Sequence, residues 1–196
     1  MTAFLLDKYQ GRNFSVITSV FEDAPLENNA YDLIYAASAF HWVDVAIGCP
    51  KAHRLLKPGG VFALMRYNEP GGAGALNDEI MAAYEKHYTA FYTSKQRLPK
   101  KSREDYLTPA EIMRGFGCED MRQFGFDDIS MKLYDTTLTF SAEEYIAFIA
   151  TMADIRGLPE SNRTALFSGI KAAILRHGNC YRIAHIFQLY MGRKSV

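Results

Sequence analysis

Two short apolar runs, joined by one helical segment, most constrain what this chain can fold into. The first, "YDLIYAA" at residues 31–37, is apolar on both faces after Asp32, and "VFALM" at residues 61–65 is a second run of this kind. Strands of this type are typical of parallel sheets that helices cover on both sides. Between them, Asp44 to Leu56 carries a helical pattern with Asp44 as the expected N-cap, and "KPGG" at residues 57–60 breaks it. The order predicts a strand–helix–strand unit with a right-handed crossover.

Patterns in the rest of the chain predict further helices and strands around this unit. We expect the end of a helix over residues 1–9, a β-branched strand over 14–20, and a long amphipathic helix over 76–91. Further along, the patterns predict a short helix over 109–114, a strand over 129–140 whose alternation changes phase near Asp135, a capping box at 141–144 and a helix over 160–177. The last strand is predicted to bury one face, made of Tyr181, Ile183, His185, Phe187, Leu189 and Met191.

Length and charge limit the classes of function. With 196 residues the chain is long enough for one domain with a full-sized core. Lysine plus arginine and aspartate plus glutamate each total 22, and this neutral balance argues against a nucleic-acid binder that neutralises phosphates. The one cationic run, Lys95 to Glu104, is best interpreted as a solvated loop.

The cysteines and the apolar runs point to a cytoplasmic protein with no membrane partner. Cys49, Cys118 and Cys180 are odd in number and lack metal-ligand spacing, which favours free thiols and predicts no metal site. No apolar run reaches the length that spans a bilayer, and the N-terminus is too short and too charged for a signal peptide. The oligomeric state stays open, with a homo-oligomer as one option.

Two quoted segments, "FEDAPLENNAYDLIYAASAFHWVD" and "AHRLLKPGGVFALM", resemble the class I S-adenosylmethionine-dependent methyltransferases. The resemblance is strong over residues 14–70 and is greatest to the small-molecule branch similar to trans-aconitate methyltransferase. It implies a Rossmann-like, doubly wound α/β sheet with an antiparallel last strand, S-adenosylmethionine as the cofactor, and a small-molecule methyl acceptor with a carboxylate or hydroxyl group. It also implies one domain, with residues 1–70 as part of the cofactor-binding half, 71–128 as a helical cap and 129–196 as a strand–helix–helix–strand segment.

The resemblance carries roles over to particular positions. The end of the strand at residues 31–37 would lie along the methionine part of the cofactor, and the segment 19–23 would contact adenine. The implied cofactor-binding residues are therefore Phe21, Glu22, Ala36, Ala37, Ser38, Phe40 and Trp42. Ligands in open α/β sheets bind beyond the carboxyl ends of strands, so "FHW" at 40–42 would close the methyl-donor site and face the acceptor. His41 is the candidate catalytic residue, and Arg66 and Tyr67 are candidate acceptor-binding residues.

Each of these assignments has a structural alternative. Phe40 and Trp42 could simply pack under the next helix, with His41 as a satisfied polar group. Arg66 could be an ordinary surface charge, which is the commoner state of an arginine.

The sequence lacks the acidic, glycine-rich turn and the ribose-binding acid that this family places before these segments. We therefore expect an N-terminally truncated sheet without its first two strands, and weak cofactor binding by this chain alone. Three explanations stay open, in this order: a fragment or mis-started reading frame, a partner chain that supplies the missing strands, or a degenerate protein. The alternative function is a non-catalytic interaction module, and a nucleotide-dependent oxidoreductase is a third, less favoured interpretation because nothing replaces "LKPGG" as positive evidence.

Overall fold

A computed structural model describes residues 2–70, 72–92, 104–107 and 118–195. Its elements, in chain order, are α1 (Thr2–Lys8), η1 (Phe21–Asp23), β1 (Tyr31–Ala37), η2 (Phe40–Trp42), α2 (Val45–Leu55), β2 (Leu56–Asn68), α3 (Ala75–Tyr84), η3 (Glu85–Thr89), η4 (Glu104–Leu107), α5 (Cys118–Gln123), β3 (Phe126–Phe140), α6 (Ala142–Ile149), α7 (Ala153–Arg156), α8 (Glu160–Arg176) and β4 (Tyr181–Lys194). The expected helix at 109–114 and most of the cationic run lie outside the described residues.

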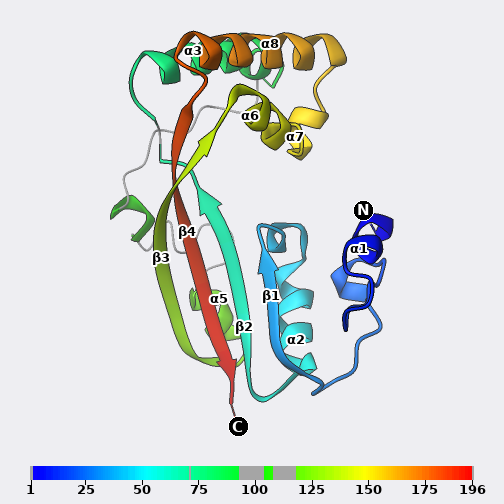
Figure 1. Cartoon of the computed structure of the whole chain (residues 1–196). Helices are drawn as coiled ribbons and strands as arrows, with labels where there is room; N and C mark the ends of the chain where they lie inside the picture. The colour runs from blue at the N-terminus through cyan, green and yellow to red at the C-terminus, as the bar shows by residue number, and fades with distance from the viewer. Residues whose placement is uncertain (1, 71, 93–103, 108–117, 196) are drawn as a thin grey trace. The chain divides into compact units, whose positions relative to one another are not determined.

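The strands hydrogen-bond in the order β1-β2-β4-β3, and β1 pairs with β2 in parallel. The arrowheads of β2 and β4 point in opposite directions (Figure 1), so the last strand is antiparallel to its neighbour. The predicted α/β class, the parallel strand–helix–strand unit and the antiparallel last strand are confirmed. Asp44 caps α2 as predicted, because its carboxylate accepts a hydrogen bond from the Ala46 backbone N–H at 2.9 Å.

Three expectations about the strands are wrong. Residues 14–20 form no strand, and Phe14, Ile17 and Val20 are exposed, because no described strand lies beside them. β1 is covered on one face only among the described residues, since Leu33 and Tyr35 are 53% and 63% exposed. "KPGG" does not separate helix from strand, because β2 already begins at Leu56.

The "KPGG" segment instead forms an irregularity inside β2. Tyr31 is opposite Leu56 and Leu33 is opposite Val61, so β2 uses several extra residues where β1 advances by two. Gly59 adopts a positive φ of 77°, a conformation that favours glycine. The irregularity sets the register that brings Ala36 and Ala37 opposite Leu64 and Met65 at the carboxyl end of β1.

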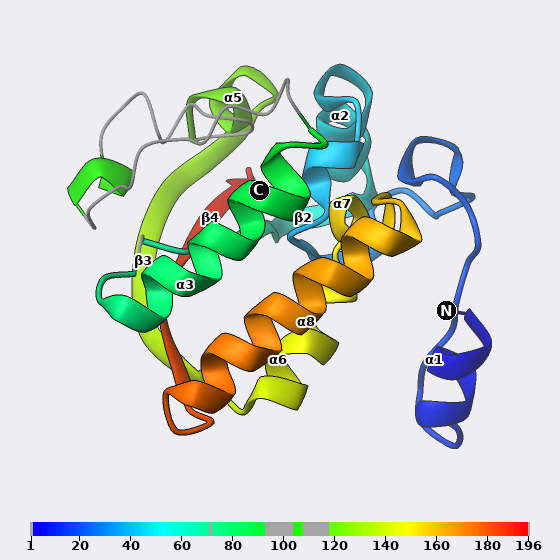
Figure 2. The ribbon, with the colours of Figure 1, turned by 90° about the horizontal axis from the view of Figure 1, so that it is seen from above.

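The chain divides into two compact units, each assembled from separate segments. Unit 1 comprises residues 1–66, 107–133 and 188–196, and unit 2 comprises 67–106 and 134–187. The core of unit 1 includes Phe40, Cys49, Ala52, Leu56, Phe62, Leu64, Met121, Phe126 and Tyr190. The core of unit 2 is built mainly from the helices α3, α6 and α8, and α3 and α8 lie side by side (Figure 2).

The predicted capping box opens α6 in unit 2. The Ser141 side chain accepts from the Glu144 backbone N–H, and the Glu144 carboxylate accepts from the Ser141 backbone N–H at 2.8 Å. The two bonds satisfy donors that a helix N-terminus otherwise leaves unpaired. The predicted 76–91 helix is present as α3 followed by the π-helical turn η3.

Within the described ranges, no helix combines the length and the apolar character that crossing a bilayer requires.

Candidate functional site

The carboxyl end of β1 is built from small residues and a sharp change of backbone direction. Ala36 and Ala37 still pair with β2, and the Ser38 backbone N–H donates to the Met65 carbonyl at 2.7 Å. Ser38 then adopts a positive φ of 49°, a conformation that is uncommon for a residue with a side chain. The chain therefore leaves the sheet directly after Ala37, with short side chains where a ligand could approach the backbone.

The next turn, η2, divides its three aromatic residues between core and solvent. Phe40 is buried and packs edge-on against Phe62, with 5.3 Å between ring centroids. His41 and Trp42 are exposed, and Trp42 keeps 76% of its surface in water. Their rings lie 5.0 Å apart. A tryptophan this exposed contributes little to the core, which makes Trp42 the stronger candidate for ligand contact.

Close packing against α2 holds η2 in place. A Cβ at Gly48 would lie 2.3 Å from Cγ1 of Val43 and 3.2 Å from Cζ of Phe40. Glycine at this position lets α2 approach η2. Phe40 therefore packs under the next helix, as the structural alternative had it. Trp42 does not pack under this helix, so the same alternative is wrong for Trp42.

A hydrogen bond of Glu22 links η1 to the N-cap of α2. Its carboxylate accepts a hydrogen bond from the Asp44 backbone N–H at 2.8 Å. This bond, followed by one from the Glu22 backbone N–H and by the charge of Lys51, holds the pKa of Glu22 below its ordinary value. The carboxylate therefore stays ionised at neutral pH and helps to position the loop that precedes α2.

The buried side chain of Lys51 also binds this loop. Its Nζ donates to the carbonyls of Glu22 and Ala24 at 2.9 and 2.6 Å, and it lies 5.6 Å from the centroid of the Phe21 ring. Phe21 and Glu22 thus have structural partners of their own. The contact between Glu22 and Asp44 brings η1 next to the segment that follows η2.

Eight of the predicted site residues lie together in the structure, and the other two, Arg66 and Tyr67, have partners elsewhere. Unit 1 holds Phe21, Glu22, Ala36, Ala37, Ser38, Phe40, His41 and Trp42, around the carboxyl end of β1 and the start of α2. Arg66 belongs to the same unit, where its Nε donates to Oε1 of Gln188 at 2.8 Å. Tyr67 belongs to unit 2, where its ring centroid lies 5.5 Å from that of His185. The roles of all ten stay predictions.

Sequence reasoning missed a second group of polar residues, which lies in unit 2. His185 is buried, and its Nε2 lies 3.3 Å from Oε1 of Glu69. Burial raises the pKa of Glu69, and the neighbouring His185 opposes that shift. A histidine on the buried face of an alternating strand was the available signal, because a buried polar group needs a partner. Among the described residues, no group of three or more histidine, cysteine, aspartate or glutamate side chains is arranged to hold a metal ion.

Residues 1–64 match the family model described as "Methyltransferase domain". Over 44 residues the chain is 43% identical to an uncharacterised methyltransferase of Mycobacterium tuberculosis (strain ATCC 25618 / H37Rv), covering 22% of this chain and 18% of that protein. Over 43 residues it is 44% identical to malonyl-[acyl-carrier protein] O-methyltransferase of Dechloromonas aromatica, covering 22% of this chain and 16% of that protein. The aligned part thus spans less than a fifth of these curated relatives.

A solved structure shares the fold over most of the chain. A candidate type II methyltransferase of Anaeromyxobacter dehalogenans superposes with a TM-score of 0.54 and 16% identity, over 92% of this chain and 72% of that chain. This likeness shows the fold alone. The sheet of β1 to β4 with its helices is the arrangement found in that methyltransferase-like structure.

Proposed function

We propose that this chain serves S-adenosylmethionine-dependent transfer of a methyl group to a small molecule that offers a carboxylate or a hydroxyl group. One observation carries the proposal: the match of residues 1–64 to the methyltransferase domain family covers the segment that builds η1, β1, η2, α2 and most of β2. All the proposed cofactor-binding residues lie inside that segment.

The residues around the end of β1 fit the cofactor in size and chemistry. Ala36, Ala37 and Ser38 would lie along the methionine part, because their small side chains leave the backbone accessible. Phe21 and Glu22 would face adenine, with Glu22 held by the Asp44 N–H. Phe40 would support the site from the core, and the exposed ring of Trp42 would cover a bound ligand. The cofactor, when bound, supplies a sulfonium-activated methyl group.

The chain's own contribution to catalysis is positioning, because an activated methyl group needs little acid–base assistance. His41 is exposed beside Trp42, and in this proposal it orients the acceptor. For a hydroxyl acceptor the His41 imidazole takes the hydroxyl proton, whereas a carboxylate acceptor has no proton to lose. Arg66 would contribute to acceptor binding from the same unit, whereas Tyr67, in unit 2, stays a prediction from the sequence alone.

Trp42 provides a direct test of cofactor contact, because it is the only tryptophan in the chain. We expect S-adenosylhomocysteine to change its fluorescence saturably, in a titration that extends to millimolar concentrations to cover the weak binding expected of this chain alone. Adenosine at the same concentrations controls for absorption and unspecific contact. No saturable change would refute the proposed contact.

A second experiment tests transfer itself and the role of His41. The chain is incubated with methyl-labelled S-adenosylmethionine and a panel of small carboxylic acids and alcohols, and labelled product is measured. We expect His41→Ala to lower turnover of a hydroxyl acceptor by about a hundredfold or more, with little effect on S-adenosylhomocysteine affinity. His87→Ala is the control, since His87 lies in unit 2 outside the proposed site. A loss confined to cofactor affinity would assign His41 to cofactor binding instead, and absence of any transfer would count against catalysis by this chain.

A further inference from the structure

A hollow of about 410 Å³ is formed by α3, η3 and α8 within unit 2. Three of its seven lining residues are small: Ala82, Ala83 and Gly169. The two helices approach each other closely here, because a Cβ at Gly169 would lie 3.2 Å from the Cβ of Ala83. Short side chains at this approach leave the space open. Its volume lies within the range of about 300–1,000 Å³ that is usual for small-molecule pockets.

The other four lining residues have ionisable side chains, and three of these are basic. They are Glu79, Lys86, His87 and Arg176. Even with the histidine neutral, a lysine and an arginine stand against one carboxylate. The lining therefore carries a net positive charge, which favours an anionic ligand over a cationic one.

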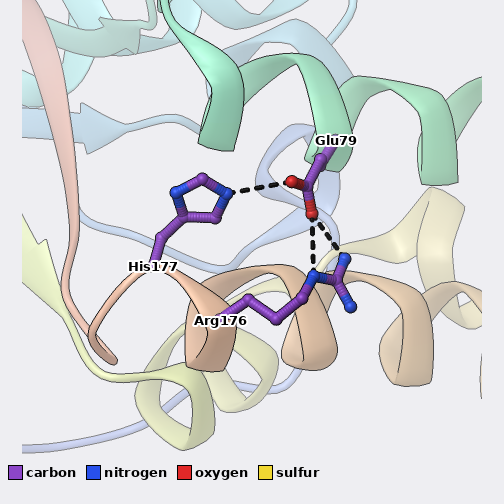
Figure 3. Close-up of polar contacts among 3 residues, drawn as sticks. All are labelled: Glu79, Arg176 and His177. Carbon is purple, nitrogen blue, oxygen red and sulfur yellow. Dashed lines mark hydrogen bonds and ion pairs between the residues drawn. The ribbon is translucent and has the colours of Figure 1, made fainter.

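The carboxylate of Glu79, on α3, fixes the orientation of Arg176. Its Oε2 accepts hydrogen bonds from Nε of Arg176 at 3.2 Å and from Nη2, and its Oε1 lies 2.9 Å from Nε2 of His177 (Figure 3). Hydrogen bonds from His177 and Arg176 hold the pKa of Glu79 below its ordinary value, so the carboxylate is ionised at neutral pH. An arginine has five N–H donors, and Glu79 engages only those of Nε and Nη2. Arg176 is therefore held in one orientation while Nη1 takes no part in the contact with Glu79.

Lys86 supplies the second permanent cation of the hollow. It follows Glu79 by seven residues, about two helical turns or roughly 10 Å along the axis. Among the residues that the structure describes, the Lys86 ammonium group has no hydrogen bond or ion pair. Lys171 on α8 differs in this respect, because its Nζ lies 2.6 Å from a carboxylate oxygen of Glu143. The hollow thus has an oriented guanidinium towards one end and an unmatched ammonium group towards the other.

We propose that this α3–α8 hollow binds a small organic dianion with a carboxylate at each end. One carboxylate accepts hydrogen bonds from Nη1 of Arg176, and the other lies at the ammonium group of Lys86. The aliphatic chain between them covers the small residues of the lining. Glu79 is a positioning residue in this site, because it orients Arg176 and does not itself bind the anion. The inference goes beyond methyl transfer, and it is tested without S-adenosylmethionine.

Isothermal titration of the full chain with disodium glutarate tests the hollow. Sodium butyrate, which has one carboxylate, the neutral glutaramide, and sodium chloride at matched ionic strength serve as ligand controls. We expect saturable binding of glutarate, at least about tenfold tighter than that of butyrate and at least about tenfold weaker in Lys86→Gln and in Arg176→Gln. Lys171→Gln is the matched control and should bind glutarate as the wild type does, because it removes a lysine of α8 that already has its carboxylate.

Histidine resonances of the wild-type chain provide a second readout that needs no folded variant. Glutarate should shift the imidazole signals of His87, which lines the hollow, whereas binding at the proposed acceptor site would shift those of His41. Absence of saturable binding, equal binding of butyrate, or unchanged affinity in Lys86→Gln or Arg176→Gln would each overturn the proposal. An equal loss in Lys171→Gln, or a shift at His41 without one at His87, would overturn it as well.

Discussion

Gly48→Ala probes how tightly α2 holds the η2 turn. In an unconstrained helix interior, replacing glycine with alanine stabilises by about 1 kcal/mol. At Gly48, however, the new Cβ would lie 2.3 Å from Cγ1 of Val43. Carbon atoms in contact normally lie about 3.5–4.0 Å apart, so the turn or the helix must move by more than 1 Å.

The balance of the two effects predicts a net loss of stability. Overpacking a well-packed site costs about 1–3 kcal/mol. The Val43 side chain cannot readily swing aside, because it is β-branched and stiff, and the new Cβ would also lie only 3.2 Å from Cζ of Phe40. Subtracting the helix-propensity gain, we expect Gly48→Ala to lower the free energy of unfolding by about 1 kcal/mol.

Urea unfolding followed by circular dichroism measures this change. Val43→Ala removes the clashing methyl group, so it should rescue Gly48→Ala, and the double variant should be more stable than the sum of the two single changes by about 1 kcal/mol. A Gly48→Ala chain that is about 1 kcal/mol more stable than wild type, with additive behaviour in the double variant, would refute the close packing described here.

Two further variants test contacts that position the rest of the structure. Ser141→Ala removes the side chain that caps α6 and should lower the free energy of unfolding by about 1 kcal/mol, measured by urea unfolding followed by circular dichroism, whereas an unchanged value would show that the cap contributes nothing. Glu22→Gln should make stability less sensitive to acid: the folded-state pKa of Glu22 lies below 4.5, so its contribution is present above pH 4.5 and is lost as the pH falls through the lower folded value. The free energies of unfolding of wild type and variant, plotted against pH, should converge at low pH. A constant difference between them at every pH would contradict the role given to the Asp44 N–H.

Local sequence patterns predicted the strand–helix–strand unit because each of its signals has a local cause. Asp44 caps α2 through its own side chain, and the capping box at Ser141 and Glu144 needs no distant partner. The strand expected over 14–20 failed for the opposite reason. β-Branched residues favour a strand only where a half-buried sheet surface is available, and none of the described strands lies beside this segment.

The candidate site was also predictable only in part, because some of its contacts are local in sequence and others form only in the fold. The small residues at the end of β1 and the exposed aromatic turn follow one another in sequence, so a pattern could single them out. Glu69 directly follows β2, and His185 lies on β4, so the pair joins residues more than a hundred positions apart in the chain. Neither residue has a motif around it, and only the fold brings them to 3.3 Å.

β4 shows how tertiary context interrupts a pattern that begins correctly. Ile183 and His185 are buried as the alternation predicted, but Ile186, Gln188 and Tyr190 are buried next, while Phe187 is exposed. Ile183 belongs to the core of unit 2 and Tyr190 to that of unit 1, so a single period of two cannot describe the whole strand. The polar residues His185 and Gln188 lie on either side of this change, and each finds its partner within its own unit, Glu69 for one and Arg66 for the other. The buried polar residues His185 and Gln188 therefore mark where β4 leaves the core of unit 2 and enters that of unit 1, and each needs a partner that the alternation alone could not identify.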